Sequence, residues 1–499
     1  MELPFPSTFF SFLFIVFLLV KLRNAFKTSS PSASRLPPGP WKLPIIGSIH
    51  HLSGSLLHHT LRDLAKKHGP LMHLKLGEVS TVVVSSPETA KEVMKIHDLN
   101  FASRPIILAT ELMSYGAANI TFSPYGDYWR QLRKMCVFEL LSTKRVRLLR
   151  SVREGEVASL INSLVSANGS PVNLTEKLYS TAYTTTSKGA FGNEAKDQQT
   201  FISIVKELTR IASGFNLTDL YPSIKVFQWT SGIRQKLGRL QQQTDKMLEN
   251  IINEHIEAKT KMTCEGGLQE DLVDILLKFQ DEGVEFQLKK DNIKAVLLDI
   301  FIAGSETSAT TVDWAMSEML KNTRIMEKAQ DEVRRVFSSR GSVDETEFYK
   351  LDYMKSVIKE TLRMHPPAPL LLPRECRQKC KIQGYDIQEK TRVIVNAWAI
   401  GRDPRYWEEA ECFYPERFLD SPVDYKGTDF EYIPFGSGRR VCPGMSYGIA
   451  SVELLLANLL YHFDWKLPHE IEELDLTEAF GVTVRRKDDL FVIPIPHYL

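Results

Sequence analysis

Residues 435–444 read Phe-Gly-Ser-Gly-Arg-Arg-Val-Cys-Pro-Gly, and this stretch decides the fold more than any other. Glycines ahead of Cys442 permit a tight turn that a Cβ would block. An apolar run with helical spacing follows from Met445 to Leu460. Cys442 is therefore expected at the N-terminal end of a helix, where free N–H groups and the helix dipole stabilise an anion. A thiolate there is a metal ligand or a nucleophile, and a buried structural cysteine is the simpler alternative; the segment alone leaves all three open.

The spacing Phe435-x-x-Gly438-x-Arg440-x-Cys442-x-Gly444 resembles the haem-binding signature of the cytochromes P450. Five fixed residues at these positions should occur by chance in such a chain on the order of once in ten thousand. The resemblance implies the cytochrome P450 fold, mainly α with small β-sheets, and haem b as the cofactor. It also implies that the Cys442 thiolate binds the haem iron and favours O–O cleavage. Arg440 would pair with a haem propionate, and Phe435 would belong to the same cofactor-binding loop.

A second motif, Ala303-Gly-Ser-Glu-Thr-Ser308, lies inside a long apolar segment. Glycine and polar residues are costly inside an apolar helix, so they need a reason, and a solvent-facing side is the simplest one. The motif resembles the P450 segment that crosses over the haem. That resemblance implies that Gly304 leaves room for bound O₂. It also implies that Thr307 and Glu306 deliver protons to the distal oxygen.

Glu360 and Arg363 have the i, i+3 spacing that usually forms a weak surface ion pair on a helix. In order and spacing before Cys442, however, the pair resembles the buried E-x-x-R pair of the P450 family. Arg417, in the sequence Pro-Glu-Arg-Phe, would complete a triad. The resemblance implies a structural role for the triad, namely support of the cysteine loop.

Trp129 and Arg133 resemble the family's segment that lies against the haem propionates. The alternative for this stretch is a plain basic face of a helix, which is a more serious competitor for Arg130 than for the other two. Arg374, which follows a proline, is a further propionate candidate by position.

The first 22 residues predict a membrane anchor. Residues 3–20 are almost wholly apolar, at the short end of what spans a bilayer as a helix. A cleaved signal peptide is the alternative, but no basic cluster precedes the run and no small-residue cleavage site follows it. Lys21, Arg23 and Lys27 follow directly, so the downstream chain is expected on the cytoplasmic side. The predicted division is an anchor (1–22), a basic and proline-rich linker (23–40) and a haem-thiolate domain (41–499), held in the endoplasmic reticulum membrane by one span.

The bulk composition fits a large globular domain. The chain has 499 residues, and the charges of its 62 Lys and Arg residues nearly cancel those of its 61 Asp and Glu residues. It therefore has no strong overall positive charge that would attract nucleic acid. Five of the six cysteines read as free thiols, since a chain this long needs no disulfide staples. Alternating β-branched residues predict a hairpin over 73–85 and a strand over 392–397. Apolar periodicity predicts long helices over 128–141, 232–261, 291–321, 324–337, 351–364 and 445–463.

The substrate is predicted to be apolar. By resemblance, the pocket is lined by segments at about 101–125, 206–214, 298–306, 368–372 and 479–483, and these carry many apolar residues. Other stretches, such as residues 396–403, resemble plant specialised-metabolism members. A terpenoid is therefore the favoured substrate, with monoterpene indole alkaloids and flavonoids as alternatives.

Electrons must come from outside, because no flavin or nicotinamide motif is present. The predicted donor is an NADPH–cytochrome P450 reductase in the same membrane, docking on a basic face around Arg133, Lys134, Arg439 and Arg440. Two competing classes remain: a haem-thiolate isomerase or dehydratase, which needs no reductase, and a haem or lipid carrier. The intact pair Glu306 and Thr307 favours the monooxygenase over the isomerase.

Overall fold

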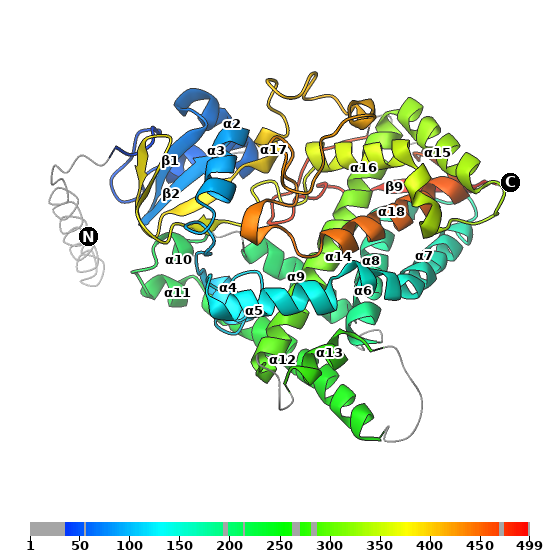
Figure 1. Cartoon of the computed structure of the whole chain (residues 1–499), viewed down its shortest axis with the longest axis horizontal. Coiled ribbons are helices and arrows are strands. Elements are labelled where there is room, and N and C mark those ends of the chain that lie inside the picture. The colour runs from blue at the N-terminus through cyan, green and yellow to red at the C-terminus, as the bar shows by residue number, and fades with distance from the viewer. Residues whose placement is uncertain are drawn as a thin grey trace, which may run out of the picture.

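The structure is a computed structural model that describes residues 35–53, 56–192, 198–212, 215–261, 270–280, 287–468 and 474–497. The predicted membrane anchor and most of the linker therefore lie outside the described residues. The described end of the linker packs along the first strand, since the backbone N–H of His73 donates to the carbonyl of Pro38 (2.8 Å). The strands β1 and β2 lie at one end of the molecule, and most helices lie toward the C-terminal end (Figure 1).

The helix α14 (Lys290–Lys321) runs through the middle of the molecule. It packs against α8 (Leu174–Phe191), α18 (Met445–His462) and α16 (Asp352–Met364). Within the described residues it is the one helix long and apolar enough to cross a membrane, but most of its apolar window is buried inside the protein. A helix that is apolar on all sides and enclosed by other helices is a core helix.

The main sheet has four strands in the order β1-β2-β7-β4. Its strands are β1 (Leu71–Leu76), β2 (Val79–Val84), β7 (Arg392–Val395) and β4 (Arg374–Glu375). The hairpin β1–β2 is antiparallel, with Leu76 opposite Val79, and it confirms the predicted hairpin. β2 and β7 pair in parallel across more than 300 residues of sequence. Two smaller sheets contain β3 (Val172–Asn173), β9 (Phe491–Pro496) and β8 (Phe463–Lys466), and β5 (Cys380–Ile382) and β6 (Tyr385–Ile387).

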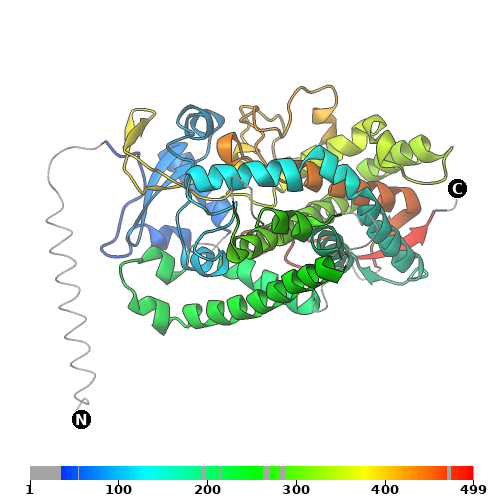
Figure 2. The same cartoon turned by 60° about the horizontal axis from the view of Figure 1, so that its bottom comes forward.

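All six predicted long helices are present. Besides α14, α16 and α18 they are α5 (Asp127–Met135), α12 (Ile233–Lys261) and α15 (Thr323–Phe337). The first of them ends earlier than predicted as an α-helix and continues as a π-helical turn over Cys136–Leu140. In Figure 2, α12 (green) runs along the edge of the molecule.

The remaining helices are shorter or lie between these elements. The α-helices are α2 (Leu57–His68), α3 (Pro87–Lys91), α4 (Leu108–Met113), α6 (Thr143–Leu148), α7 (Arg150–Val165), α9 (Gln198–Ile211), α10 (Leu217–Leu220), α11 (Val226–Thr230), α13 (Leu272–Lys278) and α17 (Ala397–Ile400). Helical turns of other types are η1 (Ile49–Leu52), η2 (Glu92–Ile96), η4 (Glu345–Lys350), η5 (Pro415–Phe418) and η6 (Gly438–Arg440).

Local capping explains where several helices begin and end. The side chain of Asn173 accepts from the backbone N–H of Glu176 at the start of α8, which satisfies one of the four free N–H groups there. Gly192 ends the same helix in the left-handed conformation. Two apolar clusters form most of the core, one around α15, α16 and α18 and one around α8, α9 and α13, and α14 contributes to both.

Candidate active site

The loop that carries Cys442 lies directly before α18, which begins three residues later at Met445. The backbone N–H of Cys442 donates to the carbonyl of Phe435 (3.0 Å) and closes the turn. Gly436 and Gly438 both have a positive φ, which glycine adopts without strain. A Cβ on Gly438 would lie 2.0 Å from the carbonyl oxygen of Met94. Both glycines are therefore required by the backbone path that brings the cysteine to the helix.

Burial raises the pKa of the Cys442 thiol, while the backbone N–H of Gly444 and the guanidinium of Arg133 lower it. Arg133, on α5, also donates to the carbonyl of Val441 (2.6 Å). The N–H of Gly444 and the charge of Arg133 together do not outweigh desolvation. A coordinated metal ion would, because it deprotonates a ligating thiol outright. The sulfur and its positive surroundings therefore fit a thiolate ligand to haem iron.

Buried arginines gather beside this loop. Arg440, Arg374 and Arg104 are all buried, and Arg133 is half-buried. Burial and then the charges of Arg374 and Arg133 lower the pKa of Arg440 to about 9. Burial likewise lowers the pKa of Arg374 to about 10, although Asp98, 3.3 Å away, opposes this shift. Mutual repulsion of this kind means that the cluster fits a group with several negative charges, and the two propionates of haem b meet that requirement.

Arg104 is a member of this cluster that sequence reasoning missed. It donates to the carbonyls of Leu372 (2.5 Å) and Pro373 (2.9 Å), directly before Arg374. Burial, followed by the charges of the other three arginines, holds its pKa well below the ordinary value. In the sequence, its role is signalled only by its place: it is a charged residue directly before a proline, in a stretch expected to line an apolar pocket.

Trp129 links α5 to the Cys442 loop. Its indole N–H donates to the carbonyl of Ile120 (2.9 Å), and the guanidinium of Arg440 lies 4.2 Å from its ring centroid. Arg440 itself donates to the carbonyls of Ala102, Ile120 and Ser123. Arg130, by contrast, is exposed and pairs with Asp127, so it belongs to the solvent-facing side of α5.

The motif in α14 divides between two sides of the helix. The hydroxyl of Thr307 donates to the carbonyl of Ala303 (2.7 Å), and both residues lie on a side that is not fully covered. Glu306 is buried against α8, where it accepts a hydrogen bond from the hydroxyl of Tyr183. Burial raises the pKa of Glu306, and this hydrogen bond lowers it. The carboxyl group and the threonine hydroxyl are thus neighbours in sequence that point to different surroundings.

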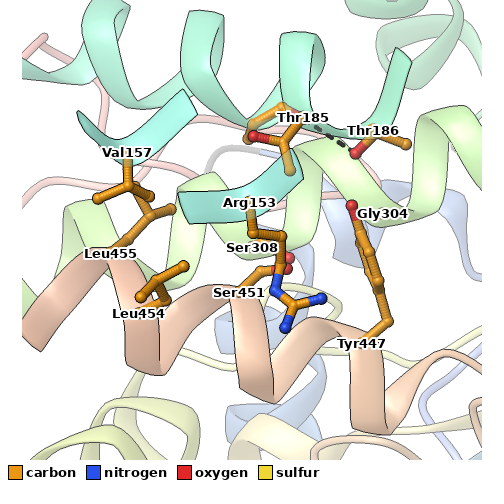
Figure 3. Close-up of a pocket in the computed structure, with 11 residues that line it drawn as sticks. Arg153, Val157, Thr185, Thr186, Gly304, Ser308, Tyr447, Ser451, Leu454 and Leu455 are labelled. Atoms are coloured by element: carbon orange, nitrogen blue, oxygen red, sulfur yellow. Dashed lines mark hydrogen bonds between the residues drawn. The ribbon is translucent and has the colours of Figure 1, made fainter. Parts of the chain in front are cut away.

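Gly304 faces a small cavity between α7, α8, α14 and α18 (Figure 3). A Cβ on Gly304 would lie 3.4 Å from the ring of Tyr447 and 3.5 Å from Thr186. Within the described residues, the buried hydroxyl of Ser308, which lines the cavity, has no hydrogen-bond partner. The space has room for roughly one water molecule, which is what such hydroxyls bind in a buried site.

The structure brings Glu360, Arg363 and Arg417 together in the interior. Arg363 Nε lies 2.7 Å from Glu360 Oε2, and Arg417 Nε lies 3.0 Å from Glu360 Oε1. The remaining N–H groups of Arg363 donate to the carbonyls of Gly401, Ala410 and Cys412. Because every charge in the triad is hydrogen-bonded, it fastens α16 to the long segment that precedes the Cys442 loop.

Comparisons with known proteins agree with this geometry. The family model described as "Cytochrome P450" matches residues 37–492. Premnaspirodiene oxygenase of Hyoscyamus muticus is 51% identical over 97% of this chain and 97% of its own length. Tabersonine 16-hydroxylase 2 of Catharanthus roseus is 50% identical over 100% of this chain and 98% of its own. Among solved structures, a zebra fish cytochrome P450 with abiraterone has a TM-score of 0.76 and 25% identity, and the match covers 89% of this chain and 99% of that one. The chain belongs to the cytochrome P450 family of haem-dependent monooxygenases, and its close relatives are enzymes of plant specialised metabolism.

Proposed function

We propose that this chain is an NADPH- and O₂-dependent haem-thiolate monooxygenase that hydroxylates an apolar plant metabolite, with a mono-, sesqui- or diterpene as its substrate. The observation that carries the proposal is the placement of Cys442 beside four arginines whose charges repel one another. Such a site suits a cofactor that is positive at its metal and negative at its edge, as haem b is.

Each residue of the site then has a distinct task. Cys442 ligates the iron, and the bound haem supplies oxygen activation, since a thiolate ligand favours O–O cleavage. Arg440, Arg374, Arg133 and Trp129 hold the propionate edge, and Phe435 closes the cysteine turn. Thr307 and Glu306 would deliver protons together, and because their side chains point to different surroundings, a proton from the Glu306 carboxyl would reach the Thr307 hydroxyl through intervening water. Gly304 has no side chain, so α14 leaves space beside the small cavity that this residue faces.

The apolar character of the predicted pocket supports a terpenoid substrate. In the segment at 101–125, the buried residues Ile107, Leu108 and Met113 are apolar. Asp299 is a charged residue in the segment at 298–306, but its carboxylate accepts from Asn119 Nδ2 (2.7 Å) and from the backbone N–H of Thr121 (2.9 Å). Burial also raises its pKa to about 6. The Asp299 carboxylate is thus hydrogen-bonded within the protein and presents little charge to a ligand.

The relatives support two substrate classes. Premnaspirodiene oxygenase acts on a terpenoid, and this favours the terpenoid proposal. Tabersonine 16-hydroxylase 2 acts on an alkaloid, so a monoterpene indole alkaloid is the second candidate. The presence of both Glu306 and Thr307 favours hydroxylation over a haem-thiolate isomerase reaction.

The reductase is proposed to dock on the face beside the cysteine loop. Lys134 on α5 and Arg439 on η6 are exposed there, whereas Arg440 is buried and Arg133 is half-buried. The exposed pair would attract acidic groups of an NADPH–cytochrome P450 reductase. Charge attraction of this kind affects the rate of association more than the affinity.

The membrane proposal rests on an exposed apolar surface as well as on the N-terminal sequence. Trp41 and Trp229 are each 62% exposed, and Ile45, Leu217 and Val226 are exposed too. The backbone N–H of Glu78 donates to the carbonyl of Leu220 (2.8 Å), so the segment with α10 and α11 lies against the β1–β2 hairpin. Exposed tryptophans beside aliphatic residues are typical of a surface that rests in a membrane interface. We propose that this surface lies on the endoplasmic reticulum membrane with residues 1–22 as the single span.

A product screen tests the proposed function. Microsomes carrying the chain and a plant reductase receive NADPH with terpenes, indole alkaloids or flavonoids, and microsomes with the Cys442→Ser variant serve as the blank. A product heavier by one oxygen in the terpene wells supports the proposal. Oxidation of an alkaloid or flavonoid beside a silent terpene panel would keep the reaction and overturn the substrate. Product formation without NADPH would overturn the monooxygenase reaction.

A further inference from the structure

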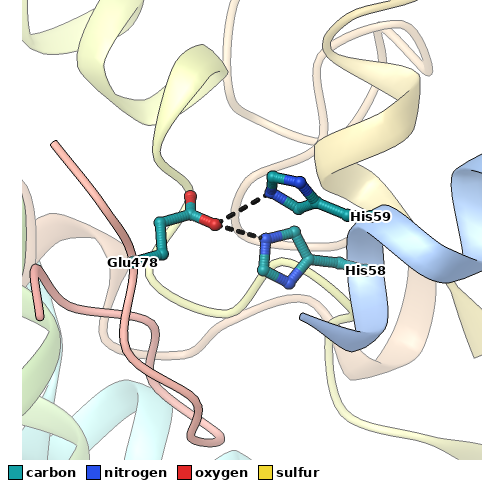
Figure 4. A group of neighbouring side chains, drawn as sticks. All are labelled: His58, His59 and Glu478. Carbon is teal, nitrogen blue, oxygen red and sulfur yellow. Dashed lines mark hydrogen bonds and ion pairs between the residues drawn. The ribbon is translucent and has the colours of Figure 1, made fainter. Parts of the chain in front are cut away.

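Two adjacent histidines and a distant glutamate converge at a second place in the fold. His58 and His59 on α2 both point toward Glu478, which lies in the C-terminal segment before β9 (Figure 4). Their Nε2 atoms lie 2.7 Å and 3.0 Å from the same carboxylate oxygen. The three potential ligand atoms all lie within 4.8 Å of one another. Two imidazoles and one carboxylate are a donor set that binds divalent transition metals in proteins.

A third imidazole borders this cluster with an unused nitrogen. His365, at the end of α16, is only 8% exposed, and within the described residues its Nδ1 has no hydrogen-bond partner. That Nδ1 lies 4.0 Å from the other oxygen of Glu478. The opposite ring nitrogen is held by Glu318 at 2.7 Å. A carboxylate fixing one nitrogen of an imidazole, while the other nitrogen is free, is the arrangement that typically orients a metal-binding histidine.

Aromatic packing fixes the three rings in place. His365 stacks on Trp314, with ring centroids 3.9 Å apart and planes 3° from parallel. His59 stacks on Trp398 at 4.2 Å, and His58 meets the same indole edge-on at 4.9 Å. Rings that are held by packing lose little freedom when they bind an ion, which favours binding.

We propose that His58, His59 and Glu478, with His365 as a fourth donor, bind one divalent transition-metal ion, Zn²⁺ in the first place. Zn²⁺ takes four nitrogen and oxygen ligands in a tetrahedron with bonds of about 2.0–2.1 Å, so neighbouring ligand atoms stand about 3.3 Å apart. His58 and His59 lie 2.7 Å and 3.0 Å from Oε2 of Glu478, slightly closer than that separation, and His365 lies 4.0 Å from Oε1, slightly farther. Small shifts of the side chains would therefore bring the donors to the ion, which displaces the protons on the coordinating nitrogens.

The ion would fasten three segments that are far apart in the sequence. Glu478 directly precedes residues 479–483, which are expected to line the substrate pocket. His58 and His59 belong to α2, and His365 directly follows α16. An ion that binds the folded chain and not the unfolded chain stabilises the folded state. Zn²⁺ is therefore expected to raise the melting temperature.

Calorimetric titration of ZnCl₂ into the tag-free, chelator-treated holoprotein at pH 7.5 tests the site. Wild type should bind one ion, and His59→Ala and Glu478→Gln should each bind it about tenfold more weakly or worse. The matched control is His51→Ala, from the neighbouring adjacent pair His50 and His51, and it should bind as wild type does. Equal affinity in wild type and in both site variants means an adventitious ion only, and overturns the proposal.

An element-specific measurement keeps the test independent of how well the variants fold. Zn K-edge X-ray absorption of the wild-type holoprotein with one equivalent of Zn²⁺ reports the zinc ligands without interference from haem iron. Nitrogen and oxygen neighbours at about 2.0 Å with imidazole scattering support the proposal. A shell of oxygen alone, or one containing sulfur, contradicts it.

Discussion

The phenol of Tyr183 on α8 donates a hydrogen bond to the carboxylate of Glu306 on α14, between two buried helices. Further side-chain hydrogen bonds join the same two helices. Tyr179 bonds Thr310 at 2.7 Å, and Thr175 donates to Asp313 at 2.6 Å. Burial and then the charge of Glu306 raise the pKa of Tyr183 far above its ordinary value, so the phenol stays protonated and remains a donor. Tyr183 therefore positions the carboxyl group that is proposed to supply protons.

Removing that donor should impair proton delivery. A hydrogen bond to a charged group contributes about 1.5–3 kcal/mol, so Tyr183→Phe is expected to lower coupling of NADPH consumption to product by about tenfold. Product, peroxide and NADPH are measured together, and the solvent isotope effect on product formation should rise. Tyr179→Phe removes an equivalent hydroxyl one turn away and should leave coupling near the wild-type value. Equal losses in the two variants would contradict the positioning role.

Thr307→Ala should separate electron transfer from product formation. The hydroxyl of Thr307 directly follows Glu306 in sequence, and it donates to the carbonyl of Ala303. Its loss is expected to release peroxide while NADPH consumption continues. Thr307→Ser keeps the hydroxyl and should restore most of the coupling. Unchanged coupling in the alanine variant counts against a proton-relay role for Thr307.

Arg363→Ala should prevent stable haem incorporation. The substitution leaves Glu360 buried without its main partner, which costs about 3–5 kcal/mol. Arg324→Ala is the control, because its ion pair with Glu416 is exposed on the arginine side and should contribute at most about 1 kcal/mol. Haem content per protein is read from the pyridine haemochrome. A soluble Arg363→Ala protein with full haem content would refute the structural role.

Stability should fall as the pH rises through the range in which His255 titrates. Burial opposes the charged imidazole, but the hydrogen bond and charge of Asp271, 2.7 Å away, outweigh it and raise the pKa of His255 to about 9. The pair's stabilisation is therefore complete below pH 6.5, the ordinary value, and is lost between pH 6.5 and about 9. After allowance for solvent screening, the loss is about 1 kcal/mol. Across this pH range the melting temperature of His255→Gln should fall less than that of wild type. An identical fall in both proteins would contradict the assignment.

The sequence predicted local structure better than it predicted contacts between distant segments. Apolar periodicity located α12, α14 and α18 because each helix must bury a face or be buried entirely. The β1–β2 hairpin was also predicted, but its parallel pairing with β7 was not, because no local pattern encodes it. The convergence of His58 and Glu478 was missed for the same reason.

Within the candidate site, motifs gave the residue identities and the structure gave their partners. The motif around Cys442 predicted the turn, and the positive φ of Gly438 is the physical reason for one of its glycines. Arg104 has no motif of its own, and only the fold brings its charge beside Arg374 and Arg440. Tyr183 likewise reads as an ordinary helix residue until α8 is packed against α14.

The carbon monoxide difference spectrum of the reduced protein tests the thiolate assignment most directly. Wild type and Cys442→Ser are compared at equal haem content, with Cys412→Ser, which alters an exposed free thiol, as the control. The red-shifted band of a thiolate-ligated haem is expected in wild type and in the control, and its loss is expected in Cys442→Ser. A Cys442→Ser protein that keeps the red-shifted band would contradict the assignment of Cys442 as the iron ligand, because another residue would then be the ligand.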